Sequence, residues 1–115
     1  MKKYAYPRSE KLKQDKDFTL LFKKGKWRTA GAVRLVFTSS DEVQKPKVGV
    51  SASKKLFKRS IDRNRAKRLL RAVYRHHKEA FAQKFGNQTL AMLFWISPEL
   101  PPNYQTVEAD FLKLL

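Results

Sequence analysis

The chain has 115 residues, with 26 lysines and arginines against 10 aspartates and glutamates, which gives a formal net charge of +16 and a pI near 10.4. Such a cationic excess is typical of nucleic-acid binding, and 42% hydrophobic and 12% aromatic residues suffice for one packed domain. The absence of cysteine excludes disulfides, thiolate metal sites and cysteine nucleophiles.

The N-terminal segment is basic but lacks the apolar stretch that a signal peptide requires. No uncharged apolar run approaches the roughly 20 residues that cross a bilayer. We therefore expect a cytoplasmic protein without membrane contact, built as one RNA-binding domain over residues 1–115 with a flexible segment at residues 1–9.

The first predicted element is a short amphipathic helix from Lys13 to Lys24. Phe18, Leu21 and Phe22 recur there at helical spacing, and Gly25 can end the helix.

Strands are predicted where β-branched and aromatic residues gather, at Ala32–Thr38 and Lys47–Ser53, and we expect these two to pair. Trp27–Thr29 is a candidate third strand at the sheet edge. Thr89–Ile96 is almost wholly apolar, as is typical of a strand that is covered on both faces. A helix that joins parallel strands normally makes a right-handed crossover, and periodicity alone predicts that hand here.

A long second helix is predicted from about Ile61 to Phe85, with Ser60 as N-cap and Asp62 near its positive end. Gly86 and Asn87 stop it. A closing helix is expected from Tyr104 to Leu115, after a proline-rich connector. The apolar stripe of the long helix is predicted to comprise Ile61, Ala66, Leu69, Leu70, Val73, Tyr74, His77, Phe81 and Phe85.

The segment from residue 63 to residue 71 places five cationic side chains in nine residues. On a helix, Arg63, Lys67 and Arg71 form one row, and Asn64, Arg68 and Arg75 form the next. Like charges at this density repel one another unless an anion lies across them, so the segment predicts contact with a folded nucleic acid.

The residues that precede this segment complete a family pattern. The sequence carries Val48-Gly49-Val50-Ser51-Ala52-Ser53-Lys54-Lys55, then Lys58, then Arg63-Asn64-Arg65-Ala66-Lys67-Arg68-Leu69-Leu70-Arg71. Together with the upstream pieces Lys11-Leu12-Lys13, Asp17-Phe18, Phe22-Lys23 and Gly25, this resembles the protein subunit of bacterial ribonuclease P. The resemblance covers about residues 9 to 115.

The resemblance implies an α+β fold like the second domain of ribosomal protein S5, ordered helix, strands, helix, strand, helix, with a left-handed crossover. It also implies a ribonucleoprotein that hydrolytically removes the 5′ leader of precursor tRNA. Its RNA is the catalyst and requires Mg²⁺. The implied partners are that catalytic RNA and precursor tRNA, with no obligate protein partner.

Two groups of residues correspond to the family's RNA contacts. The arginine-rich helix would contact the catalytic RNA through Arg63, Asn64, Arg65, Lys67, Arg68 and Arg71. A cleft between the first helix and the sheet would hold the leader through Phe18, Phe22, Ser51, Ser53, Lys54 and Lys55. Many members carry a further aromatic on the second strand facing this cleft, and here either Val36 or Phe37 would take that direction.

The chain shows no catalytic pattern of its own. His76 and His77 are adjacent on a helix and diverge by about a hundred degrees, so they cannot chelate one metal together. No triad, phosphate loop or zinc spacing is present. We therefore expect no catalytic residue, metal or cofactor in the protein itself.

Two other binding functions would also use a basic helix. A structural, ribosomal-type RNA-binding protein would share the fold and charge, and is the main alternative. A leucine-zipper DNA regulator is excluded because no heptad repeat follows the basic segment and Gly86 ends the helix too soon.

Overall fold

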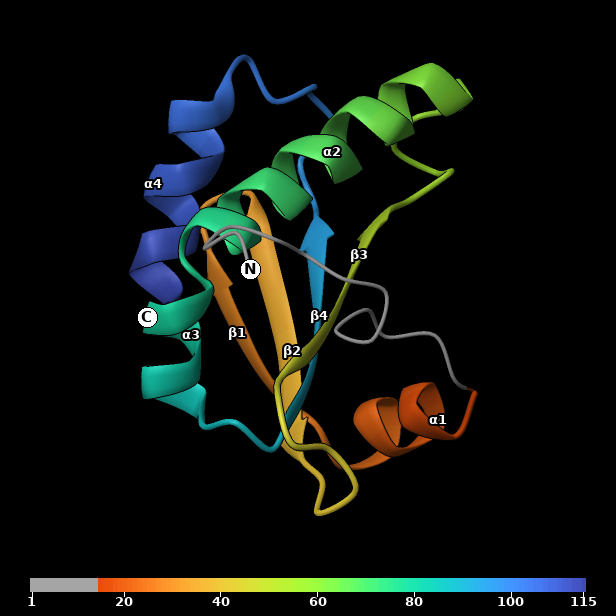
Figure 1. Ribbon diagram of the computed structural model, residues 1–115. Coiled ribbons are helices and arrows are strands. Elements are labelled where there is room, and N and C mark those ends of the chain that lie inside the picture. The colour runs from red at the N-terminus through yellow and green to blue at the C-terminus, as the bar shows by residue number, and fades with distance from the viewer. Residues whose placement is uncertain (1–14) are drawn as a thin grey trace.

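Four helices and one four-stranded sheet make up residues 15–115, the part of the chain that the computed structural model describes (Figure 1). The predicted order of elements is confirmed, except that the long second helix is divided. The elements are α1 (Asp15–Lys24), β1 (Lys26–Ala30), β2 (Val33–Ser39), β3 (Lys47–Ala52), α2 (Ser60–His76), α3 (Lys78–Phe85), β4 (Thr89–Trp95) and α4 (Tyr104–Leu114).

The strands are ordered β1-β2-β4-β3, so the candidate edge strand β1 is confirmed and the predicted pairing of β2 with β3 is wrong. β4 lies between them, antiparallel to β2 and parallel to β3. Because β4 is apolar on both faces, it gains most from a central position. β3 carries Lys47, Gly49 and Ser51 on one face, which suits a strand at the edge.

The crossover from β3 through α2 and α3 to β4 is left-handed. In Figure 1, α2 lies in front of the sheet, both strands run upward, and β4 lies to the left of β3. The right-handed expectation is therefore wrong, and the left-handed one is confirmed. β2 occupies one edge of β4, and the apolar Val48 and Val50 of β3 pack against the main core under α2.

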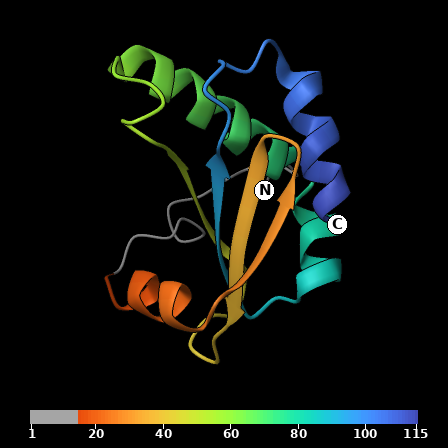
Figure 2. The same cartoon turned by 180° about the vertical axis from the view of Figure 1, so that it is seen from behind.

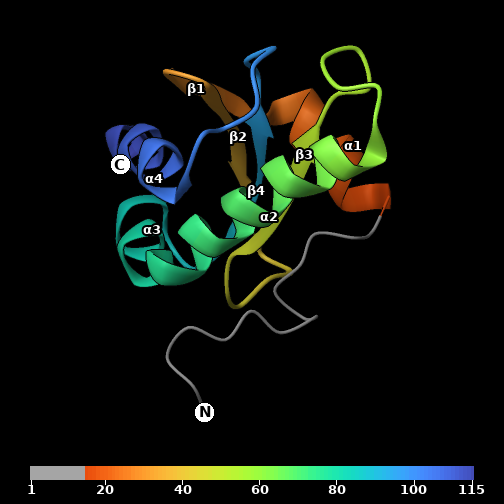
Figure 3. The same ribbon diagram turned by 90° about the horizontal axis from the view of Figure 1, so that it is seen from above.

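The helices cover the two faces of the sheet unequally. Seen from above, α2, α3 and α4 lie along one face (Figure 3), where they enclose the main core around Leu35, Leu70, Leu93 and Phe111. α1 covers only the lower end of the other face (Figure 2), through a smaller cluster that includes Leu21. None of the four helices of residues 15–115 covers the upper part of that second face.

The predicted single helix over residues 61–85 is interrupted at His77. This residue has φ −120° and ψ 21°, and its N–H is shared between the carbonyl oxygens of Val73 at 3.2 Å and Tyr74 at 3.1 Å. The turn redirects the chain so that α3 packs Phe85 against Phe37 of β2, with ring centroids 4.7 Å apart. A straight helix would carry Phe85 away from the sheet.

Gly25 fixes where α1 ends and how closely it approaches the sheet. Its N–H donates to the carbonyl oxygen of Leu21 at 2.8 Å, which closes the helix at Lys24 as predicted. A Cβ at this position would collide with that carbonyl and lie 2.6 Å from a methyl group of Val36. Phe22 is thereby held beside the start of β1. The predicted first helical residues 13 and 14, and the segment 1–9, lie outside the described residues.

Candidate nucleic-acid interface

The exposed side of α2 carries a compact row of polar and cationic side chains, the outer row. Successive positions on a helix are about 100° apart, so these four fall within about 60° of one another, opposite the buried Ala66, Leu70 and Val73. The members of the outer row are Asn64, Arg68, Arg71 and Arg75, all of them exposed.

No ion pair within residues 15–115 neutralises the positive charge of this row. Residues 15–115 contain two ion pairs, Lys16 with Glu42 and His77 with Glu108, and neither includes an arginine or lysine of α2. Cationic side chains at i, i+3 and i, i+4 spacing therefore repel one another until an anion binds across them.

Arg63 ties the start of α2 to the preceding loop. Its Nη1 donates to the carbonyl oxygens of Phe57 at 2.8 Å and Lys58 at 3.0 Å, and its Nη2 donates to the hydroxyl of Ser60 at 3.0 Å. The predicted N-cap role of Ser60 is wrong, because the helix begins at this residue and Arg59 occupies the cap position without a side-chain bond. The Ser60 hydroxyl instead accepts a hydrogen bond from the guanidinium of Arg63.

Arg65 points away from the outer row and toward the connector before α4. Its Nη2 donates to the carbonyl oxygens of Pro101 at 3.4 Å and Pro102 at 3.3 Å. The prediction that Ile61 belongs to the apolar stripe is wrong, since 64% of this residue is exposed. Ile61 lies three and seven residues before Asn64 and Arg68, and so shares their side of the helix.

An aromatic cluster occupies the other face of the sheet. Phe22 of α1, Trp27 of β1 and Phe94 of β4 lie with ring centroids 6.0–6.3 Å apart, and Phe22 and Trp27 are each 50% exposed. The Cζ of Arg34 lies 5.9 Å from the Trp27 ring centroid, a cation–π contact. This cluster is a platform of two exposed rings and one half-buried ring, with a cation beside it.

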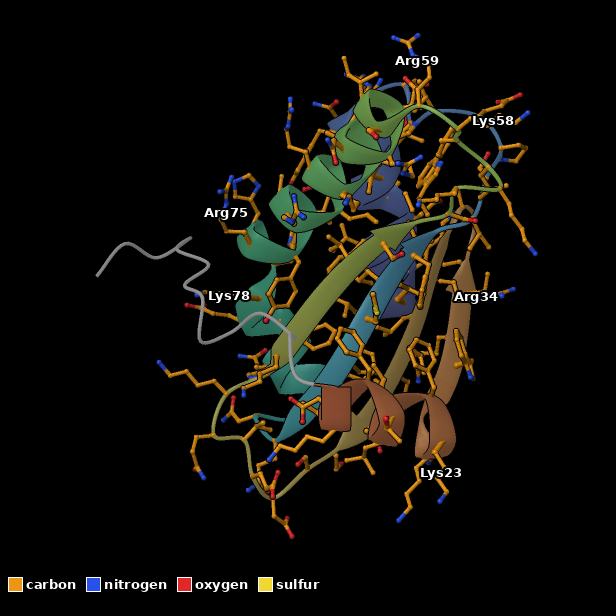
Figure 4. All side chains as sticks on the ribbon, turned by 90° about the vertical axis from the view of Figure 1, so that its right-hand side faces the viewer. Lys23, Arg34, Lys58, Arg59, Arg75 and Lys78 are labelled. Atoms are coloured by element: carbon orange, nitrogen blue, oxygen red, sulfur yellow. The ribbon has the colours of Figure 1, made fainter. Side chains whose placement is uncertain are left out.

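Strand pairing brings these residues to one face. Phe94 lies opposite Arg34 on β2 and beside Ser51 on β3, so the three side chains share a side of the sheet. In Figure 4, Arg34 and Lys23 project on the α1 side, whereas Arg75 and Lys78 project from the α2 and α3 side. The outer row and the aromatic cluster thus lie on different sides of the molecule.

The other predicted leader residues are placed less uniformly. Phe18 is half-buried and packs against the cluster formed by Leu21 and its neighbours, so it supports α1 from beneath. Ser53, Lys54 and Lys55 are exposed in the turn after β3, where the Ser53 hydroxyl accepts from the Lys55 N–H at 3.0 Å. This turn leads to α2 and lies at the opposite end of the sheet from α1 (Figure 1).

Two histidines fasten the α2–α3 turn to α4. The Nε2 of His77 lies 2.8 Å from a carboxylate oxygen of Glu108, and the Nδ1 of His76 lies 2.8 Å from the hydroxyl of Tyr104. The hydrogen bond with His77 lowers the pKa of Glu108 below its usual value, with a smaller contribution from Tyr104. Between residues 15 and 115, no three histidine, aspartate or glutamate side chains gather to hold a metal ion.

The profile of the Ribonuclease P family matches residues 6–115 of the chain. The chain belongs to this family. None of the helices described for this ribonuclease P family member is long and apolar enough to span a bilayer.

Known members of the family agree with this assignment. The ribonuclease P protein component of Dictyoglomus turgidum is 35% identical over 75 residues, which cover 65% of this chain and 61% of that protein. The chain thus spans about three fifths of that relative. The Porphyromonas gingivalis component is 31% identical, with 97% of this chain and 85% of that protein covered. The solved Staphylococcus aureus RNase P protein has the same fold, with a TM-score of 0.75 and 21% identity over 91% of this chain and 94% of that one.

Val36 and Phe37 are the two candidates for the second-strand side chain that faces the cleft beside α1, and the structure of this family member distinguishes them. Val36 faces α1 but is fully buried, whereas Phe37 packs on the opposite face against Phe85. The exposed ring comes instead from Trp27, which lies opposite Val36, and the half-buried Phe94 stacks beside it. Sequence reasoning missed both, because strand alternation reveals them only once β4 is known to neighbour β2.

Proposed function

We propose that the chain is the protein subunit of a ribonuclease P ribonucleoprotein, which binds the catalytic RNA and the 5′ leader of precursor tRNA and assists endonucleolytic tRNA maturation in the cytoplasm. The observation that carries this proposal is the pair of different surfaces on one scaffold. One is a cationic helix whose arginines and lysines form no ion pair with residues 15–115, and the other is a platform of aromatic rings, two of them exposed. Membership of the ribonuclease P family supports the pairing of these surfaces with those two RNAs.

The catalytic RNA binds along α2. Planar guanidiniums can each take two oxygens of a phosphate or a base edge, which suits Arg68 and Arg71 for a structured RNA. Asn64 and Lys67 contact the same RNA beside them. Arg63 and Arg65 serve the surface in another way, because they hold the loop before α2 and the connector before α4 while keeping N–H groups available for phosphates.

The leader binds across the open face of the sheet. Leader sequences differ among substrates, so the contacts must be independent of base identity, and aromatic stacking provides about 1–3 kcal/mol per base in this way. Phe22, Trp27 and Phe94 are the stacking platform, and Phe18 supports α1 below it. At the end of the sheet away from α1, the leader passes Ser51, Ser53, Lys54 and Lys55.

Bond cleavage belongs to the RNA in this proposal. Mg²⁺ ions held by RNA phosphates would supply the activated water. The protein residues bind and orient: the fixed cations of α2 reduce repulsion between catalytic RNA and substrate, so less Mg²⁺ is needed for assembly.

Reconstitution with ribonuclease P RNA at low Mg²⁺ tests the proposal. The outer-row variant N64A/R68A/R71A is expected to lose assembly with the RNA. The aromatic variant F22A/W27A is expected to assemble normally but to lose preference for substrates with a leader. The variant K45A/K113A, with two lysines removed elsewhere, is the charge control and is expected to behave as the unchanged protein.

Two results would decide against the proposal. If the chain binds RNA but leaves precursor tRNA cleavage unchanged, it is a structural RNA-binding protein of the ribosomal type. If the outer-row and aromatic variants show the same defect, the assignment of two surfaces to two RNAs is wrong.

A further inference from the structure

A groove lies on the helix-covered face of the sheet, between the start of β1 and the end of α3. It encloses about 450 Å³ and is formed by β1, the end of β2, α3 and the first residue of β4. We call it the β1–α3 groove. The side chains used below are Lys26, Arg28, Phe37, Lys84 and Phe85.

The walls of this groove are cationic. Lys26 lies opposite Phe37 and Arg28 lies opposite Leu35 in the β1–β2 ladder, so both cations share the face on which Phe37 packs. Lys84 faces them from the last turn of α3. None of the nine lining residues is acidic, and the two ion pairs of residues 15–115 include none of these three cations.

The floor of the groove is aromatic, and one cation is held over it. The rings of Phe37 and Phe85 lie 4.7 Å apart at 51°, and the Cζ of Arg28 lies 6.0 Å and 5.5 Å from their centroids. Arg28 also donates through Nη1 to the carbonyl oxygen of Leu114 at 2.8 Å. These contacts fix the guanidinium and leave its other N–H groups available for a ligand.

We propose that the β1–α3 groove binds single-stranded RNA, with a phosphate held by Lys26, Arg28 and Lys84 and a base against the edges of Phe37 and Phe85. Converging cations beside aromatic rings are how proteins hold single strands independently of sequence, and the volume is that of a small-ligand site. An acidic peptide would use the cations but gain little from the rings.

The groove shares Trp27 with the leader surface proposed above, but its cations and its two phenylalanine rings lie on the other face of the sheet. The Trp27 ring projects on the α1 face of β1, while Lys26 and Arg28 project on the other face. β1 is an edge strand (Figure 2), so one single strand can contact both faces by passing around this edge. The groove therefore adds a binding site beyond the two RNA surfaces of the proposed function.

An amide NMR titration of the full chain with an octauridylate tests the inference. We expect shifts at Lys26, Arg28 and Lys84 that persist in the F22A background, where the leader platform is weakened and Trp27, which also lines the groove, is kept. In that background, adding K26A/K84A should abolish these shifts and lower the slope of log affinity against log salt by about 0.7, the value for one phosphate contact on a single strand. K45A/K113A, which removes two exposed lysines outside the groove, should leave the groove shifts unchanged.

Titrations with inorganic phosphate and with an acidic octapeptide distinguish RNA from other possible ligands of the groove. Inorganic phosphate at matched ionic strength should shift the lysine amides without shifting those of Phe37 and Phe85. If the octauridylate leaves the groove amides unmoved, or an acidic octapeptide shifts them more strongly, the proposal is overturned. Retained thermal unfolding of K26A/K84A would show that lost shifts do not reflect misfolding.

Discussion

Arg63 and Arg68 lie in the same basic segment, yet replacing them should have different effects on folding. Arg63 makes bonds to the carbonyl oxygens of Phe57 and Lys58 and to the Ser60 hydroxyl. A hydrogen bond from a charged donor is worth about 1.5–3 kcal/mol, and partial exposure reduces this, so we expect Arg63→Ala to cost about 2 kcal/mol in total. For a domain near this size, that lowers the melting temperature by about 8 °C. Arg68→Ala should change stability by less than about 0.5 kcal/mol.

Thermal unfolding followed by circular dichroism, at fixed salt and without RNA, measures this difference. Arg63→Lys is the conservative variant, and it should recover only part of the loss because an ammonium group cannot span the carbonyls and the hydroxyl at once. Equal melting temperatures for Arg63→Ala and Arg68→Ala would refute the positioning role of Arg63. Arg63 would then be a surface cation without a structural role.

Three further predictions concern binding and pH. F22A/W27A should weaken binding of precursor tRNA with a leader by about 5- to 150-fold per lost stacked base and leave mature tRNA binding unchanged, as measured by fluorescence anisotropy. Polyphosphate should raise the melting temperature, because an anion relieves the repulsion among the +16 excess charges, and an unchanged value would contradict that explanation. The lowered pKa of Glu108 means that its bond to His77 stabilises the fold fully above the usual carboxyl value of 4.5, and that this contribution is lost as pH falls through the lower folded value. Glu108→Gln should therefore flatten the decline in melting temperature below about pH 4.5, and an identical pH profile for both proteins would rule out this linkage.

The local elements were predictable because their signals are local. Apolar spacing placed α1 and α4, and the apolar run at Thr89–Trp95 identified the central strand. The break at His77 was not predictable, because the apolar positions continue through it with helical spacing. What bends the chain is tertiary: Phe85 packs on Phe37 and His77 bonds Glu108, contacts that depend on elements distant in sequence.

The site was only partly predictable for the same reason. The basic segment shows its charge directly, so the exposed Arg68 and Arg71 follow from the sequence alone. The inward bonds of Arg63 do not, since a guanidinium at the start of a helix can equally face solvent. The rings of Trp27 and Phe94 meet only because β2 and β4 are neighbours, which the sequence pattern did not show.

Cleavage assays with and without the catalytic RNA test the central claim most directly. The chain, purified free of nucleic acid, is incubated with 5′-labelled precursor tRNA alone, and then with ribonuclease P RNA at a Mg²⁺ concentration too low for the RNA by itself. Leader removal should occur only when protein and RNA are combined. Cleavage at the mature 5′ end by the protein alone would contradict the claim that this chain binds and orients RNA while the RNA performs the chemistry.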